Sequence, residues 1–188
     1  MKATWAYFEK ALSDTACKEL IEYIESKYEY TEAKIGFEDS NTLNEDYRKC
    51  DVAWVDARDS DVSELLWYYA LRANRDYFNF DLQYINEIQF TRYDGDKIFP
   101  GKYDWHHDVN WGETGTHHRK LSISIILNDE YEGGILEMDP TDCEALPKEA
   151  NTKGTIILFP SFFRHQVTPV TSGTRYSLVT WIEGPKWR

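Results

Sequence analysis

The chain has 188 residues, of which 41% are hydrophobic and 15% aromatic, and its formal net charge is -12. This length and composition suit one packed domain and exclude an extensively disordered chain. The acidity argues against proteins that bind nucleic acid or anionic membranes non-specifically, because both tasks need clustered lysine and arginine.

The cysteines and the N-terminus bear on the cellular compartment. Cys17, Cys50 and Cys143 are far apart and odd in number, so neither a disulfide framework nor a cysteine zinc site is expected. The first residues lack the apolar run of a signal peptide, and no stretch approaches the roughly 20 apolar residues of a membrane span. The sequence therefore predicts a cytoplasmic protein with no membrane partner.

Helical patterns dominate the first part of the chain, residues 1–82. Ser13 or Asp14 can cap a helix whose apolar residues recur with helical spacing, namely Cys17, Leu20, Ile21 and Ile24. A second helix is predicted after the polar run 56–61, with an apolar stripe made of Val62, Leu65, Leu66, Tyr69 and Ala73. Trp54 and Trp67 are predicted to be core residues. We expect this part to support the rest of the domain.

From about Ile85 the apolar period changes to two, which predicts strands at 85–93, 121–127 and 154–159. Two further strands, 165–170 and 174–182, flank a stretch with Gly173 that is typical of a hairpin turn. Helices followed by many strands indicate an α+β fold. We expect a single domain, 1–188, in which 83–188 form a jelly roll, or double-stranded β-helix, supported by the N-terminal helices.

The stretch "YDWHHDVNW", residues 103–111, combines two histidines and two aspartates with aromatic residues. If it is extended, His106 and Asp108 share one face and His107 points to the other. An H-x-D pattern alone is a weak signal, because a surface loop with a hydrogen-bonded histidine has the same appearance. The fragment by itself leaves a metal site and a polar loop open.

A second cluster strengthens the metal reading. If the predicted hairpin is centred near Ser172, His165 faces the same side as Arg175 and Ser177, and Arg175 lies roughly 13 Å further along the ladder. An arginine that faces a β core is costly unless it pairs with an anion, and a salt bridge within that core is the alternative. Two histidines and one carboxylate leave three metal positions open, as in iron(II) oxygenases.

The order of these motifs resembles that of the Fe(II)/2-oxoglutarate dioxygenases, and within them the prolyl 4-hydroxylase-like group of compact bacterial and phage proteins. "HHD" matches the H-x-D of the group. "FPSFFRHQVTPVTSGTRYSLVTWI" matches its distal histidine, a basic residue ten positions later and a serine two beyond. "LSISIILNDEYEGGILEM" and "RKCDVAWV" (48–55) resemble a strand with its turn and an N-terminal strand of the group. The likeness spans most of the chain.

This resemblance implies roles for individual residues. His106, Asp108 and His165 would bind iron, and Arg175 would pair with the distal carboxylate of 2-oxoglutarate, helped by Ser177. The tyrosine that hydrogen-bonds the same carboxylate would be Tyr93, with Tyr103 as the competing candidate. The substrate would be contacted by the side chains of Arg119, Trp181, Trp105 and Trp111. His117 and His118 are expected to face solvent, and the polar stretches 39–49 and 116–120 are candidates for a lid.

The resemblance also implies an activity. Fe(II), 2-oxoglutarate and O2, with ascorbate as a further candidate, would serve to hydroxylate an unactivated C–H bond while 2-oxoglutarate becomes succinate and CO2. The expected substrate is a prolyl residue of a peptide or protein. A free amino acid or another small molecule, a non-catalytic cupin-like metal-binding module and a zinc hydrolase are the alternatives. No nucleic-acid partner is expected.

Overall fold

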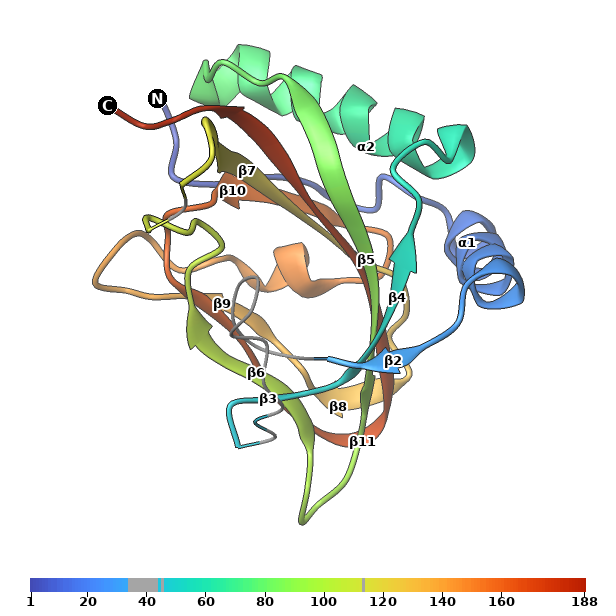
Figure 1. Cartoon of the computed structure of the whole chain (residues 1–188). Helices are drawn as coiled ribbons and strands as arrows, with labels where there is room; N and C mark the ends of the chain where they lie inside the picture. Colours follow the sequence, from blue (N-terminus) through green and yellow to red (C-terminus); the bar gives the residue numbers. More distant parts are fainter. Residues whose placement is uncertain (34–43, 45, 113) are drawn as a thin grey trace.

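The computed structural model describes residues 1–33, 44, 46–112 and 114–188, and it contains two antiparallel sheets that share one long strand (Figure 1). The helical elements are α1 (Asp14–Lys27), α2 (Ser60–Ala73), a π-helical turn (Asn74–Phe78) and a 3-10 turn (Lys148–Asn151). The strands are β1 (Ala6–Phe8), β2 (Thr31–Glu32), β3 (Arg48–Lys49), β4 (Asp51–Val55), β5 (Tyr84–Asp94), β6 (Gly101–His106), β7 (His117–Ile126), β8 (Tyr131–Gly133), β9 (Leu136–Met138), β10 (Ile156–Pro160) and β11 (His165–Pro185).

The larger sheet has the strand order β1-β10-β7-β11-β5-β4-β2. The smaller sheet is built along the first part of β11, which pairs with β6, β8 and β9, while β3 pairs with β6. All of these pairs are antiparallel, and the predicted α+β class is confirmed. The predicted helical part also supplies β1 and β2, which no sequence pattern had indicated.

Both helices lie on the outer side of the larger sheet, away from the smaller one (Figure 1). The side chain of Ser13 caps α1 by accepting a hydrogen bond from the backbone of Ala16 at 3.1 Å. Ile24 of α1 and Leu66 of α2 are buried in one cluster with the outward residues of the sheet. Each fully buried side chain of this kind contributes about 2 kcal/mol of hydrophobic stabilisation. The apolar stripes predicted for the two helices are therefore the faces that cover the sheet.

The carboxylate of Asp59 joins the two helices. It accepts hydrogen bonds of 2.8 Å from the hydroxyls of Tyr23 and Tyr28 and from the ammonium group of Lys27. The hydrogen bond from Lys27 is the main reason why the pKa of Asp59 falls to about 2. A buried charge whose acceptor capacity is filled in this way stabilises the fold.

The predicted hairpin around Gly173 is wrong, because residues 165–185 form the single strand β11. The register of β11 shifts between Val170 and Ser172, which is typical of a β-bulge, and the strand passes there from the smaller sheet to the larger one. Gly173 has a φ of 71°, and a Cβ at this position would collide with the carbonyl oxygen of Glu130. The glycine therefore permits a close crossing of chains and does not reverse the strand.

The prediction that Trp54 is a core residue is also wrong, since this side chain is 46% exposed. Trp54 pairs with Gln89 across β4 and β5, so both side chains point to the inner side of the larger sheet. β4 lies next to the edge strand β2, where that inner side stays accessible. Trp67, in contrast, packs partly buried against the helix-covered core.

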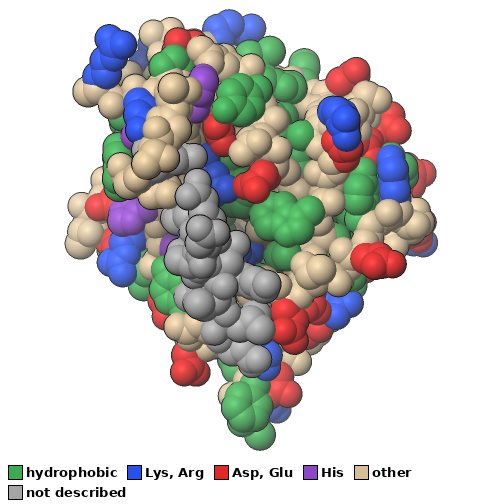
Figure 2. All heavy atoms as spheres, viewed as in Figure 1, with side chains coloured by type: hydrophobic (Ala, Val, Ile, Leu, Met, Phe, Trp, Pro, Cys, Tyr) green, Lys and Arg blue, Asp and Glu red, His purple; other side chains and the backbone are tan. Residues whose placement is uncertain are grey.

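Three further features concern the acidic side chains, the cysteines and the length of the helices. Figure 2 shows acidic side chains in several separate places on one face, interspersed with lysine and arginine. Cys17, Cys50 and Cys143 are unpaired, as expected. Within the described residues, no helix is both long enough and apolar enough to cross a membrane.

Candidate metal centre

His106, Asp108 and His165 converge between the two sheets. His106 ends β6 and His165 begins β11, and these two residues are partners in the ladder. The Nε2 atoms of His106 and His165 lie 3.6 Å and 3.5 Å from the two carboxylate oxygens of Asp108. One ligand atom from each of the three residues lies within 4.8 Å of the others. Two imidazoles and a carboxylate at this spacing can hold one divalent metal ion.

Backbone carbonyl groups fix both imidazoles. The Nδ1 atom of His106 lies 2.8 Å from the carbonyl oxygen of Asp104, and that of His165 lies 3.1 Å from the carbonyl oxygen of Phe163. A carbonyl oxygen only accepts, so Nδ1 carries the hydrogen and the lone pair of Nε2 faces Asp108. Burial lowers the pKa of His165 to about 4 although Asp108 opposes the shift, so this imidazole is neutral at pH 7. The neutral form is the one that binds metals.

Asp108 is held as a carboxylate by its neighbours. Burial raises the pKa of this carboxyl group, but the hydrogen bond from Ser122 is among the interactions that outweigh burial, so the pKa lies below its ordinary value. The hydroxyl of Ser122 donates to Asp108 at 2.6 Å and lies 2.9 Å from that of Ser161. Sequence reasoning missed both serines. The signal available for Ser122 was a polar residue on the inward face of an otherwise apolar strand.

A cavity lies between the sheets and is lined by this cluster. Eight residues singled out from the sequence line it together: His106, Asp108, His165, Arg175, Ser177, Tyr93, Tyr103 and Trp181. Residues from both halves of β11 line the cavity although the hairpin that suggested a common face was wrong. The alternation is interrupted between these halves, where Val170 is buried and the register shifts on both of its sides.

Arg175 is the most unusual group in the cavity. It is 1% exposed, and its Nη1 atom donates to the hydroxyl of Ser177 at 2.9 Å. Its Nε and Nη2 atoms are buried and have no hydrogen-bond partner within the described residues. Gly134 makes room for it, since a Cβ there would lie 2.7 Å from the Cδ atom of Arg175. The core salt bridge considered as the alternative is absent from the described part of the chain, and the guanidinium fits an anion from outside.

The two candidate tyrosines occupy different positions in the cavity. Tyr93 is the ladder partner of Arg175, and its ring centre lies 5.5 Å from the guanidinium carbon of that residue. Tyr103 stacks on the ring of His106, with 3.5 Å between ring centres and 14° between planes. Burial raises the pKa of Tyr103 to about 12, so its hydroxyl remains a donor at neutral pH. Tyr93 thus lies next to the guanidinium of Arg175, and Tyr103 lies next to the candidate metal ligand His106.

Arg119 and Trp181 lie together at the same level as the metal cluster. The guanidinium of Arg119 stacks 3.9 Å from the ring centre of Trp181 and forms an ion pair of 2.6 Å with Glu87. The indole nitrogen of Trp181 is buried without a hydrogen-bond partner in the described residues. Sequence reasoning missed Glu87 as the group that holds Arg119.

Other predicted residues do not reach the cavity wall within the described chain. Trp111 is 59% exposed and packs edge-on against His118, and Trp105 lies near the guanidinium of Arg164. The side chain of His107 is 44% exposed and points away from the cluster.

The structure also bears on the predictions for His117 and His118 and for the two lid candidates, 39–49 and 116–120. The prediction that His118 faces solvent is wrong, since it is 5% exposed. Residues 117–120 are part of β7, so the segment 116–120 is not a loop that could close. Most of the other lid candidate, 39–49, lies outside the described residues.

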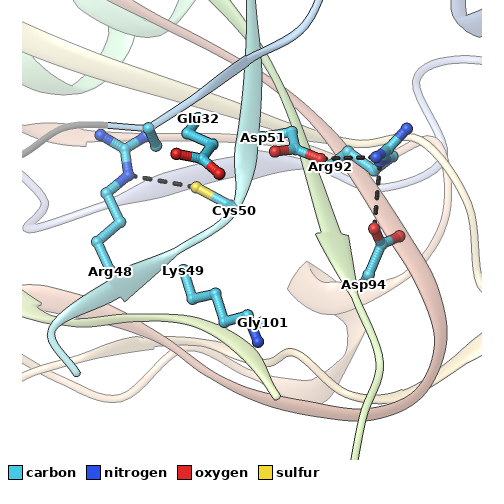
Figure 3. A pocket seen from close by; sticks show the side chains of 9 residues that line it. Glu32, Arg48, Lys49, Cys50, Asp51, Arg92, Asp94 and Gly101 are labelled. Carbon is cyan, nitrogen blue, oxygen red and sulfur yellow. Dashed lines mark hydrogen bonds and ion pairs between the residues drawn. The ribbon is translucent and has the colours of Figure 1, made fainter. Parts of the chain in front are cut away.

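A second pocket lies next to this site, near the start of β6 (Figure 3). Arg92 forms ion pairs with Asp51 and Asp94 on one side of it. On the other side, the Nε atom of Arg48 lies 3.3 Å from the sulfur of Cys50. Arg48 also stacks on Tyr103 and donates to Gln89, both of which line the main cavity. Arg48 therefore contacts both spaces, and no sequence signal had identified it.

Solved structures share this fold. A prolyl-4-hydroxylase of Pseudomonas putida superimposes with a TM-score of 0.70 at 19% identity, covering 98% of this chain and 94% of that one. A prolyl hydroxylase of Trichoplax adhaerens, in complex with a peptide fragment of the hypoxia inducible factor oxygen degradation domain, gives a TM-score of 0.72 at 17% identity, covering 95% and 83%. The predicted double-stranded β-helix is confirmed.

Sequence relatives match a shorter segment. A PKHD-type hydroxylase of Synechococcus sp. strain CC9605 is 43% identical over 83 residues, which are 43% of this chain and 36% of the relative. A PKHD-type hydroxylase of Shewanella oneidensis is 35% identical over 96 residues, 50% of this chain and 41% of the relative. The match thus spans less than half the length of these relatives.

A family model described as 2OG-Fe(II) oxygenase superfamily matches residues 88–183, which is 96 of the 188 residues and includes the whole cluster and Arg175. The chain belongs to the 2OG-Fe(II) oxygenase superfamily.

Proposed function

We propose that this protein is an Fe(II)- and 2-oxoglutarate-dependent oxygenase that hydroxylates an unactivated C–H bond. Family membership implies both the metal and the co-substrate. The observation that carries the proposal is the arrangement of one cavity. It contains a buried arginine, two of whose guanidinium nitrogens have no hydrogen-bond partner among the described residues, and a cluster of two histidines and a carboxylate. This combination suits a ligand that chelates a metal and ends in a second carboxylate.

The residues fit the metal. His106, Asp108 and His165 would hold Fe(II), because both imidazoles present Nε2 and the carboxylate is ionised. His106 ends β6, Asp108 follows it and His165 begins β11, and all three line the cavity, so a ligand in the cavity could reach a metal held there. Bound Fe(II) and O2 supply the oxidising chemistry, by which 2-oxoglutarate is converted to succinate and CO2 while the substrate gains a hydroxyl group.

The residues also fit the co-substrate. Arg175 would pair with its distal carboxylate through the guanidinium nitrogens that have no partner in the described chain. Ser177 fixes the third nitrogen of this group, and Tyr93 stands beside it in the ladder. We therefore assign the hydrogen-bonding tyrosine to Tyr93. Tyr103 is assigned to packing against the ligand His106.

For the substrate we propose a prolyl residue of a peptide or protein. The support is indirect: solved structures of the same fold carry the names of prolyl hydroxylases, one of them with a bound peptide. Arg119 and Trp181, stacked on each other at the level of the metal cluster, would contact the substrate. Trp105 and Trp111 would take part only through more distant parts of a long substrate, because they do not line the cavity in the described chain.

An anaerobic titration tests the chemistry. Adding Fe(II) and 2-oxoglutarate to the purified protein should give a weak metal-to-ligand charge-transfer band in the visible range, and O2 with ascorbate as reductant should then release succinate. If neither the band nor succinate appears, the oxygenase proposal is wrong. Binding of Zn(II) with hydrolytic activity would favour the zinc hydrolase, and metal binding without any turnover would favour the cupin-like module.

The substrate needs a separate experiment. Incubation of the active protein with proline-containing peptide libraries, followed by mass spectrometry, should find products with one added oxygen atom on proline. Oxygen added to a free amino acid or another small molecule, with every proline unmodified, would remove the prolyl proposal and leave the chemistry in place.

A further inference from the structure

Ser161 is a buried polar residue that the proposed function does not use. It directly follows β10, is 0% exposed and lies at the start of the turn that leads to His165. Its backbone N–H donates to the carbonyl oxygen of Lys120 on β7 at 3.1 Å, which fixes the start of this turn. A buried hydroxyl at such a place needs a hydrogen-bond partner, because an unpaired polar group inside a protein is costly.

The backbone of Ser161 holds the segment that carries Asp108. Its carbonyl oxygen accepts hydrogen bonds of 3.0 Å and 3.1 Å from the backbone N–H groups of Asp108 and Val109. A carbonyl oxygen has two lone pairs, so this one atom can accept both. The same turn leads to His165, whose Nδ1 atom lies 3.1 Å from the carbonyl oxygen of Phe163. Two of the three candidate metal ligands are thus anchored by the same turn.

The hydroxyl groups of Ser161 and Ser122 extend this contact to the carboxylate. Their oxygen atoms lie 2.9 Å apart, and that of Ser122 also lies 2.6 Å from Oδ2 of Asp108. A carboxylate can only accept, so the single hydrogen of the Ser122 hydroxyl is used for Asp108. The hydrogen between the two serines must then come from Ser161. The result is a chain with one direction, in which Ser161 donates to Ser122 and Ser122 donates to Asp108.

This chain of hydroxyl groups is buried and ends at the metal cluster. Oδ2 of Asp108 lies 3.5 Å from Nε2 of His165, so the chain ends at an oxygen atom that faces a second candidate ligand. Ser122 and Ser161 are 1% and 0% exposed. Hydrogen bonds in series strengthen one another inside a protein, where the effective dielectric constant is low. Removing either hydroxyl should therefore loosen the carboxylate.

We propose that Ser161 is a positioning residue of the metal centre, which acts through Ser122 to hold the carboxylate of Asp108 in the orientation that binds the metal. This inference rests on the proposed function, because it needs a divalent metal ion at His106, Asp108 and His165. It gives the turn after β10 two tasks, which are to carry one ligand and to hold another.

A double-mutant cycle on Mn(II) affinity tests this role. Ser122→Ala and Ser161→Ala each remove one hydroxyl, and the protein with both substitutions lacks the whole chain. Ser161→Ala combined with Ser124→Ala is the matched control, since Ser124 is a buried serine on β7 with no hydrogen bond to Asp108 within the described residues. Affinity is measured by competition with a fluorescent chelator, at a temperature at which thermal unfolding shows every variant to be folded.

The expected result is that the chain behaves as one unit. Ser122→Ala and Ser161→Ala should each weaken Mn(II) binding by about tenfold, the scale on which groups that orient a metal ligand contribute. The two substitutions together should also cost about tenfold, because the second one breaks a chain that is already broken. Ser161→Cys, which keeps a weak donor, should cost less than Ser161→Ala. In the Ser124→Ala protein, Ser161→Ala should keep its full effect.

Two outcomes would overturn the role of Ser161. In one, Ser161→Ala binds Mn(II) as tightly as the parent protein. In the other, the losses of Ser122→Ala and Ser161→Ala multiply to about 100-fold, which would mean that Ser161 does not act through Ser122. A parent protein that does not bind Mn(II) at all would instead show that the proposed function is wrong.

Discussion

Two regions of this molecule bury a charged side chain, and they treat it in opposite ways. At the junction of α1 and α2, the carboxylate of Asp59 is 4% exposed and accepts three hydrogen bonds from Tyr23, Tyr28 and Lys27. In the cavity, the guanidinium of Arg175 is as deeply buried but has two nitrogen atoms with no partner in the described chain.

The difference separates charges that serve the fold from charges that serve a ligand. A buried ion costs several kcal/mol, roughly, unless its hydrogen-bonding groups are satisfied. Asp59 is satisfied by the chain itself, so its contribution is already present in the folded protein. Under the proposed function, Arg175 would be satisfied by an anion from outside, and its contribution would then appear as binding affinity. The predictions that follow test this distinction.

The largest effect is expected at the metal cluster. His106→Ala removes an imidazole that presents Nε2 to Asp108, so it should abolish iron-dependent succinate formation, a loss of at least about 1,000-fold. His107→Ala is the matched control, because this neighbouring histidine is 44% exposed and should keep nearly full activity. Both are measured as initial rates of succinate release. Equal losses in the two variants would contradict the assignment.

Substitution of Arg175 should weaken co-substrate binding without lowering the stability of the protein. Arg175→Met should weaken 2-oxoglutarate binding by about 100-fold, the value of a lost bidentate ion pair. The melting temperature of the ligand-free protein should stay the same or rise, because the variant no longer buries unpaired N–H groups. Binding is followed by calorimetry with Mn(II) and stability by thermal unfolding. A large drop in melting temperature would show that Arg175 serves the fold.

Substitution of Asp59, whose carboxylate has its hydrogen bonds within the chain, should lower stability and leave binding unchanged. Asp59→Asn keeps the shape but removes the charge that accepts from two tyrosines and Lys27, so the free energy of unfolding should fall by about 2 kcal/mol. In a chain of this size that corresponds to a melting temperature lower by about 6 °C. 2-Oxoglutarate binding should be unchanged, which serves as the control for a distant effect.

The stabilisation of the fold by the Asp59 carboxylate should decrease as the pH falls. The pKa of Asp59 is about 2 in the folded protein, mainly because of the hydrogen bond from Lys27, and lies below the value of 3.8 for a free carboxyl group. A lowered pKa stabilises the fold above about pH 4, and the stabilisation is lost as the pH falls toward 2. The difference in unfolding free energy between parent and Asp59→Asn should therefore shrink from pH 6 to pH 3. A constant difference would mean that the carboxylate charge is not the cause.

The sequence predicted those parts of the fold that depend on local periodicity. The stripe through Cys17 and Ile24 reports directly which face of the helix is buried, and it was confirmed. The alternation along 85–93 correctly indicated a strand but not a single buried face, because both faces of β5 are buried in its middle. The hairpin at Gly173 was wrong because a glycine with positive φ suits a turn and a crossing equally well, and the crossing is decided by Glu130, just before β8. The prediction for Trp54 was wrong because the exposure of this side chain depends on the position of β4 in the sheet, which the sequence does not show.

For the site, the sequence indicated residues whose chemistry is unusual for their position, such as an arginine facing a β core. It did not indicate Ser122, Gln89 or Arg48, whose roles arise from contacts between separate strands. A serine, a glutamine and an arginine have many ordinary uses in a strand. Their importance becomes visible when the structure places them beside Asp108 or in the cavity wall.

The smallest effect is expected for Ser122, which donates a hydrogen bond to the candidate metal ligand Asp108. Ser122→Ala removes the hydrogen bond of 2.6 Å to Asp108 and should weaken metal affinity by about tenfold, because groups that orient a ligand usually contribute on this scale. Ser124→Ala is the matched control, since Ser124 is a buried serine two residues further along β7 and has no hydrogen bond to Asp108 within the described residues. Competition with a fluorescent chelator measures both. If the two variants lose metal equally, Asp108 is oriented by its backbone and the histidines alone, and Ser122 belongs with Asp59 among the groups that serve the fold.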